Sequence, residues 1–433
     1  MNQKLFWLCL TLILLFGLIS HLFIIRNNNL FFTVDQGRDA VYVREILKNQ
    51  RLFLKGPETS IRGIFTGPLW YYFVTIGYLL TGGHPAGGVW MLIFLNLTTI
   101  AVLVWVIAKK VNQIAALVVG AGLTFFWPFF ETSLYSFNPF PTTALAIFLV
   151  LILIKFLEGQ RRKFYFWAAI PIFLAFNANL ASAAALAIFY LLIGFLVLKR
   201  KFLPGDFSKS FIFLSLVLLL VSFLFFSWNP HYRSWQTAYL PPLLFVSLIL
   251  MLSSFPKKLG IPLLAILLLA NLLNFGRKYQ EYTASSNNPS LLYNQLTIVN
   301  WIYAQAENQG FRVYNYTDTF YDYPYQYLFY WHGFKKYGYL PDEYANYPLS
   351  PKELYVPGVS YYSEPKRSGE KTSFLIIQAT TNGETNSNWL EKFRENFNLV
   401  SSTQVGEIKV EKYERKHDAP NDPCIWWQRC TKL

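Results

Sequence analysis

The sequence predicts a polytopic α-helical membrane protein, with about nine transmembrane helices, further interfacial helices and a C-terminal α+β domain. Three observations support this fold class. The 433 residues are 54% hydrophobic and only 14% charged, whereas soluble domains carry roughly 25% charged residues. Nearly all of the hydrophobicity lies before Gly276, in runs of about 17–25 residues that are long enough to cross a bilayer. Residues 277–433 instead alternate short helix-like and strand-like segments, as a folded domain does.

The first apolar run, 5–25, has no small-residue cleavage site before Arg26, so we interpret it as an uncleaved first helix rather than a signal peptide. Further apolar runs lie at roughly 86–108, 112–130, 140–157, 164–180, 181–198, 209–228, 238–255 and 259–275. Segment 66–81 is shorter and rich in aromatic residues. It is therefore either a tenth span or an interfacial helix.

The loop charges decide between these alternatives. Residues 277–433 hold 17 basic and 17 acidic residues, so the net charge of +14 comes from residues 1–276. With nine spans, the loops between the second and the ninth span hold twelve basic residues on one side and only Arg233 on the other. The twelve are Lys109, Lys110, Lys155, Arg161, Arg162, Lys163, Lys199, Arg200, Lys201, Lys209, Lys257 and Lys258. By the positive-inside rule their side is cytoplasmic, and a span at 66–81 would invert this bias, so we expect an interfacial helix there.

This topology places the N-terminus in the cytoplasm of a multi-pass plasma-membrane protein. We expect a transmembrane region at 1–276, with a first outer loop at 26–85, and an extracytoplasmic α+β domain at 277–433. Because the basic residues lie in short loops between spans, membrane lipids and not nucleic acid are the expected contacts.

Within the outer domain, the sequence predicts helices near 291–307 and 389–396 and strands near 311–314, 374–377 and 407–413. The aromatic run 321–332 could stack on sugar rings, although such runs more often form core or lie against lipid head groups. Cys424 and Cys430, six residues apart, either form a disulfide in an oxidising compartment or stay reduced.

The loop 26–85 carries the candidate chemistry. Apolar residues at 40, 43, 46 and 47 recur at helical spacing, which predicts an amphipathic helix on the outer membrane surface. Asp35 and Asp39 share one face of that helix, and Arg38 lies three residues from Asp35. Asp35 could be the N-cap of the helix, with Asp39 a solvated partner of Arg38. Alternatively, a carboxylate here could be a general base or a metal ligand, and spacing alone does not separate these readings.

Three motifs of this loop occur in a familiar order: Asp35-Gln36-Gly37-Arg38-Asp39-Ala40, Gly56-Pro57-Glu58-Thr59-Ser60 and Gly67-Pro68-Leu69-Trp70-Tyr71-Tyr72. They resemble the N-terminal region of bacterial GT-C membrane glycosyltransferases of glycosyltransferase family 39. That group is related to protein mannosyltransferases, aminoarabinose lipid A transferases and Rgt-type sugar transferases. Phe137-Asn138-Pro139 and Tyr239-Leu240-Pro241-Pro242 extend the resemblance in patches.

The resemblance implies an inverting transferase with a polyprenyl-phosphate-linked sugar donor and a glycan, lipid or protein acceptor. An acidic residue of the first outer loop serves in such enzymes as base or metal ligand, and on this chain that residue is Asp35. Many relatives have two adjacent acidic residues, but Gln36 follows Asp35 here, so we take Asp39 as the second carboxylate. No cofactor is certain, and a divalent metal at Asp35 is the one candidate.

Transfer from a lipid phosphate also needs cations that stabilise the departing phosphate. Among the basic residues on the outward side, the candidate substrate ligands are Arg38, Lys55, Arg62, His231 and Arg233. Arg233 departs from the charge bias, which suggests a function, although an interfacial arginine can also snorkel.

Asn138 is a further candidate substrate ligand, or alternatively an ordinary helix start before Pro139. We expect Asn177 and Asn179 to be turn residues, and Gly120-Ala121-Gly122 to serve close helix packing.

Two non-enzymatic functions remain as alternatives: a transporter or flippase for lipid-linked glycans, and an assembly protein in which Asp35 is only a cap. Transporters tend to carry ionisable residues, broken helices or internal repeats at mid-membrane, whereas these spans are nearly uncharged and unrepeated. The sequence has no Gly-rich phosphate loop with Lys, no Cys/His metal spacing and no Ser-His-Asp arrangement. A soluble nucleotide-sugar donor on the inner side therefore has no visible binding site.

Overall fold

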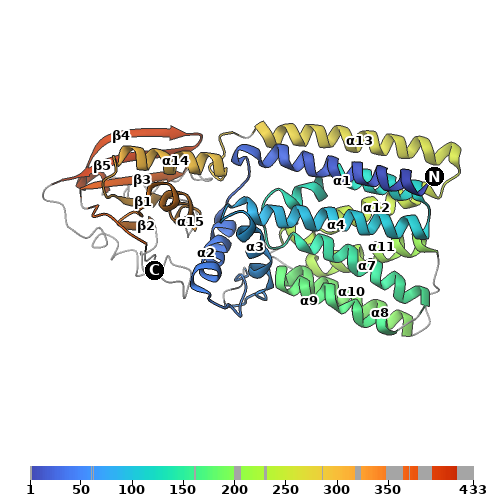
Figure 1. Ribbon diagram of the computed structural model, residues 1–433. Coiled ribbons are helices and arrows are strands. Elements are labelled where there is room, and N and C mark those ends of the chain that lie inside the picture. The colour runs from blue at the N-terminus through green and yellow to red at the C-terminus, as the bar shows by residue number, and fades with distance from the viewer. Residues whose placement is uncertain are drawn as a thin grey trace. The chain divides into compact units, whose positions relative to one another are not determined.

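The computed structural model describes residues 2–59, 61, 63–159, 162–198, 206–228, 232–284, 286–316, 323–347, 364–369, 371–378 and 393–416. The chain forms two compact units (Figure 1). We call the first the helical unit; it comprises Met1–Arg26, Phe53–Gly77 and Ala86–Thr283. The second, the sheet unit, comprises Asn27–Leu52, Tyr78–Pro85 and Ala284–Leu433. The first outer loop predicted at 26–85 is thus shared between the two units.

The helical unit is a bundle of apolar helices. Its elements are α1 (Gln3–Ile25), α4 (Ala86–Lys110), α5 (Gln113–Thr124), α6 (Trp127–Phe130), η2 (Glu131–Ser133), α7 (Pro141–Gly159), α8 (Arg162–Trp167), α9 (Ala169–Ala178), α10 (Leu180–Leu198), α11 (Phe207–Ser227), η3 (Ser234–Thr237), α12 (Leu240–Ser253) and α13 (Lys257–Ala284). A short 3-10 turn, η1 (Arg26–Asn28), follows α1, and α3 (Leu69–Leu80) has residues in both units.

Among the described residues, seven helices are long and apolar enough to cross a membrane, or eight if a bent pair counts as one span. The chain is therefore a multi-pass membrane protein. The bent pair is Gln113–Thr124 with Trp127–Ser133, and its halves meet at 67°, so the continuous span predicted at 112–130 is wrong. Pro128 has no amide hydrogen to donate to the Thr124 carbonyl four residues earlier, and its ring would clash with that carbonyl, so one continuous helix cannot run from α5 into α6.

The other differences from the predicted spans concern the lengths of two helices. The span predicted at 164–180 is the shorter apolar helix Lys163–Ala178. Leu69–Leu80, from the ambiguous segment 66–81, is shorter still and is not a candidate span. The estimate of about nine spans thus becomes seven or eight, and the bent pair and Lys163–Ala178 account for the difference.

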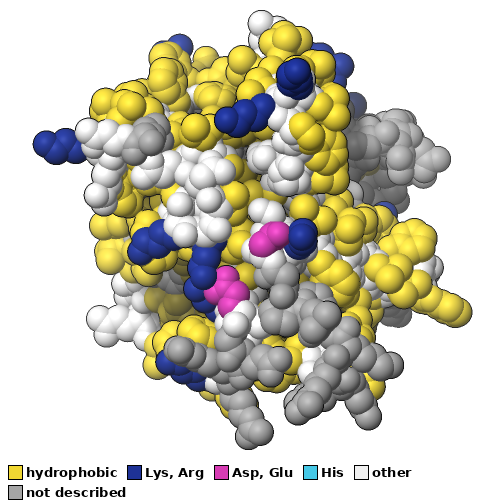
Figure 2. Space-filling view, turned by 90° about the vertical axis from the view of Figure 1, so that its right-hand side faces the viewer, with side chains coloured by type: hydrophobic (Ala, Val, Ile, Leu, Met, Phe, Trp, Pro, Cys, Tyr) yellow, Lys and Arg dark blue, Asp and Glu magenta, His cyan; other side chains and the backbone are white. Residues whose placement is uncertain are grey.

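Side-chain caps and close packing fix these helices. Asp206 Oδ1 accepts a hydrogen bond from the Lys209 amide at 2.9 Å and so caps α11. A Cβ atom on Gly120 would lie 2.7 Å from the Val104 side chain, which confirms the predicted packing role of the glycines in this span. Figure 2 shows the end of the bundle where α4 finishes and α11 begins, with basic side chains scattered over an apolar surface.

The sheet unit contains a five-stranded mixed sheet. Its elements are α2 (Val34–Asn49), α14 (Leu292–Gln305), β1 (Arg312–Tyr316), α15 (Tyr323–Leu328), the π-helix η4 (Phe329–Phe334), α16 (Lys335–Tyr337), β2 (Glu343–Tyr347), β3 (Thr372–Gln378), β4 (Phe397–Val405) and β5 (Ile408–Arg415). The strand order is β2-β1-β3-β5-β4. β1 runs parallel to β2 and β3, and β5 runs antiparallel to β3 and β4.

The core of this unit follows from the apolar run of the central strand. Phe374, Leu375 and Ile376 of β3 are fully buried on both sides of the sheet, as expected for a central strand with a continuous apolar sequence. On one face Leu375 joins Tyr314, Phe393 and other aromatic residues in a cluster. Phe374 lies 5.4 Å from Phe311, measured between ring centroids.

The predicted helix 291–307 and the strands near 311–314, 374–377 and 407–413 are confirmed as α14, β1, β3 and β5. Residues 393–396 are helical, as predicted for 389–396, while 389–392 lie outside the described residues, as do Cys424 and Cys430. The sequence did not predict β2 or β4. Of the aromatic run 321–332, Tyr323–Leu328 are all buried, which supports a core role for that part.

The chain just after α1 packs into the sheet unit. The Phe32 amide donates to Ser290 O at 2.8 Å, and the Leu292 amide donates to Leu30 O at 2.9 Å. Gln295 Nε2 also donates to Phe32 O at 3.1 Å. These bonds attach the segment that leads into α2 to the first helix of the C-terminal region.

Candidate functional site

Helix α2 begins with a capping box. Thr33 is the N-cap, and its amide donates to Gln36 Oε1 at 2.9 Å. Asp35 is therefore not the N-cap, and that alternative reading of Asp35 is wrong. Gln36 holds the helix start, so Asp35 lies in the first turn with its carboxylate available for other contacts.

Gly37 lets α2 approach α15 closely. A Cβ atom at Gly37 would lie 2.3 Å from the Pro324 nitrogen and 2.6 Å from the Tyr323 carbonyl carbon. Both are backbone positions that a side chain cannot displace easily, so only glycine fits without movement. This contact fixes the face of α2 on which the neighbouring charged residues lie.

Arg38 bridges the two candidate carboxylates. Its Nη1 donates to Asp35 Oδ1 at 2.8 Å, while its Nη2 and Nε donate to Asp39 Oδ1 at 2.8 and 3.0 Å. The Asp35 side chain is 42% exposed, whereas that of Asp39 is 2% exposed. The expected pairing of Asp39 with Arg38 is confirmed, but Asp39 is buried and not solvated.

Tyr78, in the part of α3 that belongs to the sheet unit, lies within electrostatic reach of Asp39. Burial raises the pKa of the Tyr78 phenol, and the negative charge of Asp39 raises it further. The phenol therefore stays protonated near the buried carboxylate, where it is a potential hydrogen-bond donor.

One turn further along α2, a second group of charged residues is almost fully buried. Arg44 Nη1 donates to Glu45 Oε1 at 2.6 Å and Nη2 to Glu364 Oε2 at 3.5 Å, and the three side chains are at most 4% exposed. Lys48 also pairs with Glu364, and the Arg44 guanidinium lies over the Tyr330 ring at 4.6 Å. These contacts join α2 to the residue just before Pro365 and to η4.

The other two loop motifs form a short hairpin in the helical unit. The Gly56 amide donates to Thr66 O and the Thr66 amide to Pro57 O, both at 2.9 Å. A Cβ atom at Gly56 would lie 2.1 Å from Gly67 O, which explains a glycine there. Lys55 lies just before the hairpin with its Nζ 5.0 Å from the centre of the Phe65 ring.

Asn177 fixes the end of this hairpin and the start of α3. Its Oδ1 accepts a hydrogen bond from the Leu69 amide at 3.2 Å, and its Nδ2 donates to Phe173 O at 2.9 Å. A Cβ atom at Gly67 would lie 2.0 Å from the same Oδ1. We had expected a turn residue, so the sequence analysis missed this role. An amide at the end of an apolar helix was the available signal.

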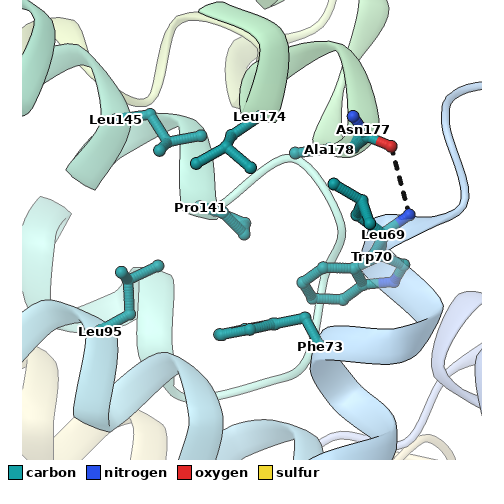
Figure 3. A pocket seen from close by; sticks show the side chains of 9 residues that line it. All are labelled: Leu69, Trp70, Phe73, Leu95, Pro141, Leu145, Leu174, Asn177 and Ala178. Atoms are coloured by element: carbon teal, nitrogen blue, oxygen red, sulfur yellow. Dashed lines mark hydrogen bonds between the residues drawn. The ribbon is translucent and has the colours of Figure 1, made fainter. Parts of the chain in front are cut away.

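Asn177 also borders a pocket of about 140 Å³ between α3, α4, α7 and α9 (Figure 3). Apolar side chains form nearly all of its wall: Leu69, Trp70, Phe73, Leu95, Pro141, Leu145, Leu174 and Ala178. An apolar cavity of about 150 Å³ stays dry and accepts small apolar molecules. This pocket suits an apolar chain segment better than a sugar.

Asn138 and Arg233 lie in other parts of the helical unit. Asn138 Nδ2 donates to Ala178 O at 2.7 Å, so its amide holds the end of α9. Arg233 is exposed, and no carboxylate of the described residues pairs with its guanidinium. Arg62 and His231, two further candidate ligands, lie outside the described residues.

The described residues do not form a ready metal site. Nowhere in the described ranges do three or more His, Cys, Asp or Glu side chains group in a way that could hold a metal. Asp35 and Asp39 both give an oxygen to Arg38 instead.

The helical unit contains a buried polar cluster that the sequence analysis did not single out. His21 of α1 is 3% exposed; its Nδ1 donates to Gly17 O at 2.7 Å and its Nε2 lies 2.8 Å from Ser133 Oγ. Asn96 Nδ2 donates to Thr132 Oγ1 at 2.9 Å beside it. The cluster lies at the second half of the bent span, where backbone groups need polar partners.

Comparison with solved structures then decides the fold. The apo structure of ArnT from Cupriavidus metallidurans aligns with a TM-score of 0.60 and 10% identity, over 95% of this chain and 98% of that one. ArnT bound to undecaprenyl phosphate aligns with a TM-score of 0.58 and 11% identity, over 93% and 97%. This chain has the GT-C fold.

A weaker alignment, with a TM-score of 0.35 and 13% identity, is to an Archaeoglobus fulgidus oligosaccharyltransferase, over 74% of this chain and 45% of that one. No protein-family profile and no curated protein sequence matches the chain. The GT-C assignment thus comes from the three-dimensional arrangement of the helices and the C-terminal sheet.

Proposed function

We propose that this chain is a membrane glycosyltransferase that moves a sugar from a polyprenyl-phosphate donor to a hydroxyl group of an acceptor outside the cytoplasm. The observation that carries the proposal is the fold shared with ArnT over nearly the whole of both chains, because one of those structures contains undecaprenyl phosphate. The acidic and basic group on α2 supports it, since it offers both kinds of side chain that the reaction needs.

The proposed chemistry divides the roles by exposure. Asp35, the exposed carboxylate, takes the proton from the acceptor hydroxyl. The acceptor oxygen then bonds to the anomeric carbon from the face opposite the phosphate, and the bond from that carbon to the phosphate oxygen breaks. The phosphate leaves with the bonding electron pair, and the anomeric configuration is inverted.

Arg38 is the proposed cation for the departing phosphate, because a guanidinium can bind two phosphate oxygens at once. Asp39 is proposed as its positioning residue, since this buried carboxylate receives two of the donors of Arg38. Within the helical unit, the proposed substrate ligands remain Lys55, Arg62, Asn138, His231 and Arg233. The apolar pocket beside Asn177 is the proposed place for part of the isoprenoid chain.

The test is a transfer assay with the full chain in liposomes and a radiolabelled polyprenyl-phosphate sugar. We expect Asp35→Asn to lower kcat by about 10²- to 10⁴-fold, the usual share of a general base. Arg38→Lys, which keeps the charge but loses the two-pronged geometry, should also lower kcat.

Asp206→Asn is the matched control, because Asp206 is an exposed helix cap and asparagine caps equally well. Normal transfer by folded Asp35→Asn would remove Asp35 as the base. Absence of transfer by the wild type, with donors that active GT-C enzymes accept under the same conditions, would argue against the proposed function.

A second candidate, a flippase for lipid-linked glycans, is favoured by one observation. Broken helices and buried ionisable residues are typical of transport pathways, and His21 lies buried beside the bent span. A flippase would move a fluorescent lipid-linked glycan from one leaflet of a proteoliposome membrane to the other without transferring the sugar to an acceptor. His21→Ala would then stop this movement. Transfer activity that survives in His21→Ala would favour the enzyme.

A further inference from the structure

Four basic side chains of the sheet unit form two neighbouring pairs, one at the loop that follows α3 and the other at Asn300. They are His84 of that loop, His332 of η4, and Lys335 and Lys336 of α16, and we call them the basic cluster. None of them belongs to the proposed glycosyl-transfer machinery. Their position along the chain is informative, because His84 is two residues before Ala86, where the membrane span α4 begins.

The loop is closely fitted to the aromatic residues beneath it. The Trp331 indole donates to Gly82 O at 3.0 Å, and the Tyr327 hydroxyl donates to Gly83 O at 2.7 Å. Gly83 has a φ of +87°, and a Cβ atom on it would lie 2.7 Å from Trp331 Cδ1. Glycine is therefore needed for both the backbone conformation and the close approach.

The first pair of basic residues meets at this loop. The His84 ring packs edge-on against Trp331 with 4.9 Å between ring centroids, and its Nε2 lies 2.9 Å from Asn28 Oδ1. Lys335 Nζ lies 3.9 Å from the place where a Cβ atom of Gly82 would be. An ammonium group thus lies over the glycine turn that carries His84.

The second pair is held by a single acceptor. Asn300 Oδ1 lies within hydrogen-bond distance of three groups: Lys336 Nζ at 2.9 Å, the Tyr337 hydroxyl at 3.0 Å and His332 Nε2 at 2.9 Å. Because the ammonium group can only donate, this atom is an acceptor, and His332 Nε2 must carry a hydrogen. Asn300 therefore holds two basic residues side by side.

In the described part of the chain, neither Lys335 nor Lys336 forms an ion pair with a carboxylate. Burial lowers the pKa of His84, and the charges of His332 and Lys335 lower it further. Burial and the charge of Lys336 likewise lower the pKa of His332. Basic groups that disfavour one another's protonation in this way would be stabilised by a bound anion.

We infer that the basic cluster is a binding site for a phosphate group. Two sources share this chemistry: the head group of an anionic membrane lipid and a free phosphate. Two observations favour the lipid head group. A membrane span begins two residues after His84, and Trp331 is of the residue type that lies at membrane interfaces. The π-helix η4 supports a functional role, because such segments occur frequently at functional sites.

The experiment is calorimetric titration of the full chain, held in nanodiscs of phosphatidylcholine. One arm adds short-chain phosphatidylglycerol and the other adds sodium phosphate. We expect Lys335→Gln/Lys336→Gln to weaken phosphatidylglycerol binding at least about tenfold, since each lysine near anionic lipid contributes roughly 1 kcal/mol. Lys335→Arg/Lys336→Arg should bind nearly as well as the wild type, which separates loss of charge from loss of folding.

The matched control is Lys371→Gln/Lys416→Gln, which removes two exposed lysines elsewhere in the sheet unit and should leave binding unchanged. The same pattern across the variants with sodium phosphate alone would support the site and name free phosphate as its source. Equal binding by all variants in both arms, or equal weakening by the control pair, would overturn the inference.

Discussion

The buried charges on α2 allow one prediction to be worked through. Arg44→Met removes the cation between Glu45 and Glu364, whose side chains are 0% and 4% exposed. Lys48, paired with Glu364, does not contact Glu45 in any described bond, so one carboxylate loses its main partner. Removing one member of a buried ion pair costs roughly 3–5 kcal/mol, because the remaining charge is left without compensation.

Hydrogen exchange can measure this loss in the sheet unit alone. A loss of 3–5 kcal/mol corresponds to roughly 10²- to 10⁴-fold faster exchange of the best protected amides, which we expect in the central strand β3. The control is Arg44→Met/Glu45→Leu, which removes both charges and should recover much of the stability, since apolar replacements of buried pairs are often neutral. Exchange within threefold of the wild type for Arg44→Met alone would refute the reasoning.

Three further predictions concern packing, pH and capping. Gly37→Ala should destabilise the sheet unit by roughly 1–3 kcal/mol through overpacking against Pro324, measured by the same exchange. The comparison is Gly276→Ala, which lies in the helical unit with open space around it and should leave exchange of the helical-unit amides unchanged. Equal destabilisation of the two units by their substitutions would contradict the packing argument. The pKa values of His84 and His332 are lower in the folded chain than in the unfolded chain, so as the pH falls the unfolded chain takes up protons at a higher pH than the folded chain does. The free energy of unfolding should therefore decrease as the pH drops below 6.5. This decrease should begin before carboxylates such as Glu411, whose ordinary pKa is 4.5, start to titrate. Exchange at a series of pH values would show this, and a slope unchanged in His84→Gln/His332→Gln would contradict it. Asn177→Ala should lower the thermal midpoint of the helical unit, because it removes a cap contribution of about 1 kcal/mol. Asn177→Asp keeps the oxygen that accepts the bond from the Leu69 amide, so its thermal midpoint should fall less. A larger fall for Asn177→Asp than for Asn177→Ala would exclude a capping role.

Much of the fold follows from sequence patterns that depend on local chemistry. Apolar length and loop charge gave the membrane helices, and the run Phe374-Leu375-Ile376-Ile377 gave the central strand. Pro128 stands within the apolar run 112–130, so the sequence contained a sign of the break. The span was predicted from the mean hydropathy of the run, and one proline hardly changes that mean. β2 and β4 were not predicted because their residues are largely polar, although β4 forms a hairpin with the neighbouring β5.

The candidate site was harder to predict, because the role of each of its residues depends on the residues that contact it in the folded chain. The spacing of Asp35, Arg38 and Asp39 predicted a shared face, but not that Asp39 would be buried while Asp35 stays exposed. Gln36 seemed to be a missing carboxylate until its bond to Thr33 showed a capping role. Asn177 also bonds to Leu69 and His21 to Ser133, and nothing in the neighbouring sequence of either residue identifies these distant partners.

The pairing of α2 with the C-terminal region has a consequence for biosynthesis. Phe32 and its partner Gln295 are 263 residues apart, and ribosomes add about 5–20 residues per second. The helix that carries Asp35 therefore emerges roughly 10–50 seconds before the segment that covers it has been made. During that interval we expect its apolar side to rest on the membrane surface, so that conditions that slow translation should prolong the exposure of α2 to proteases.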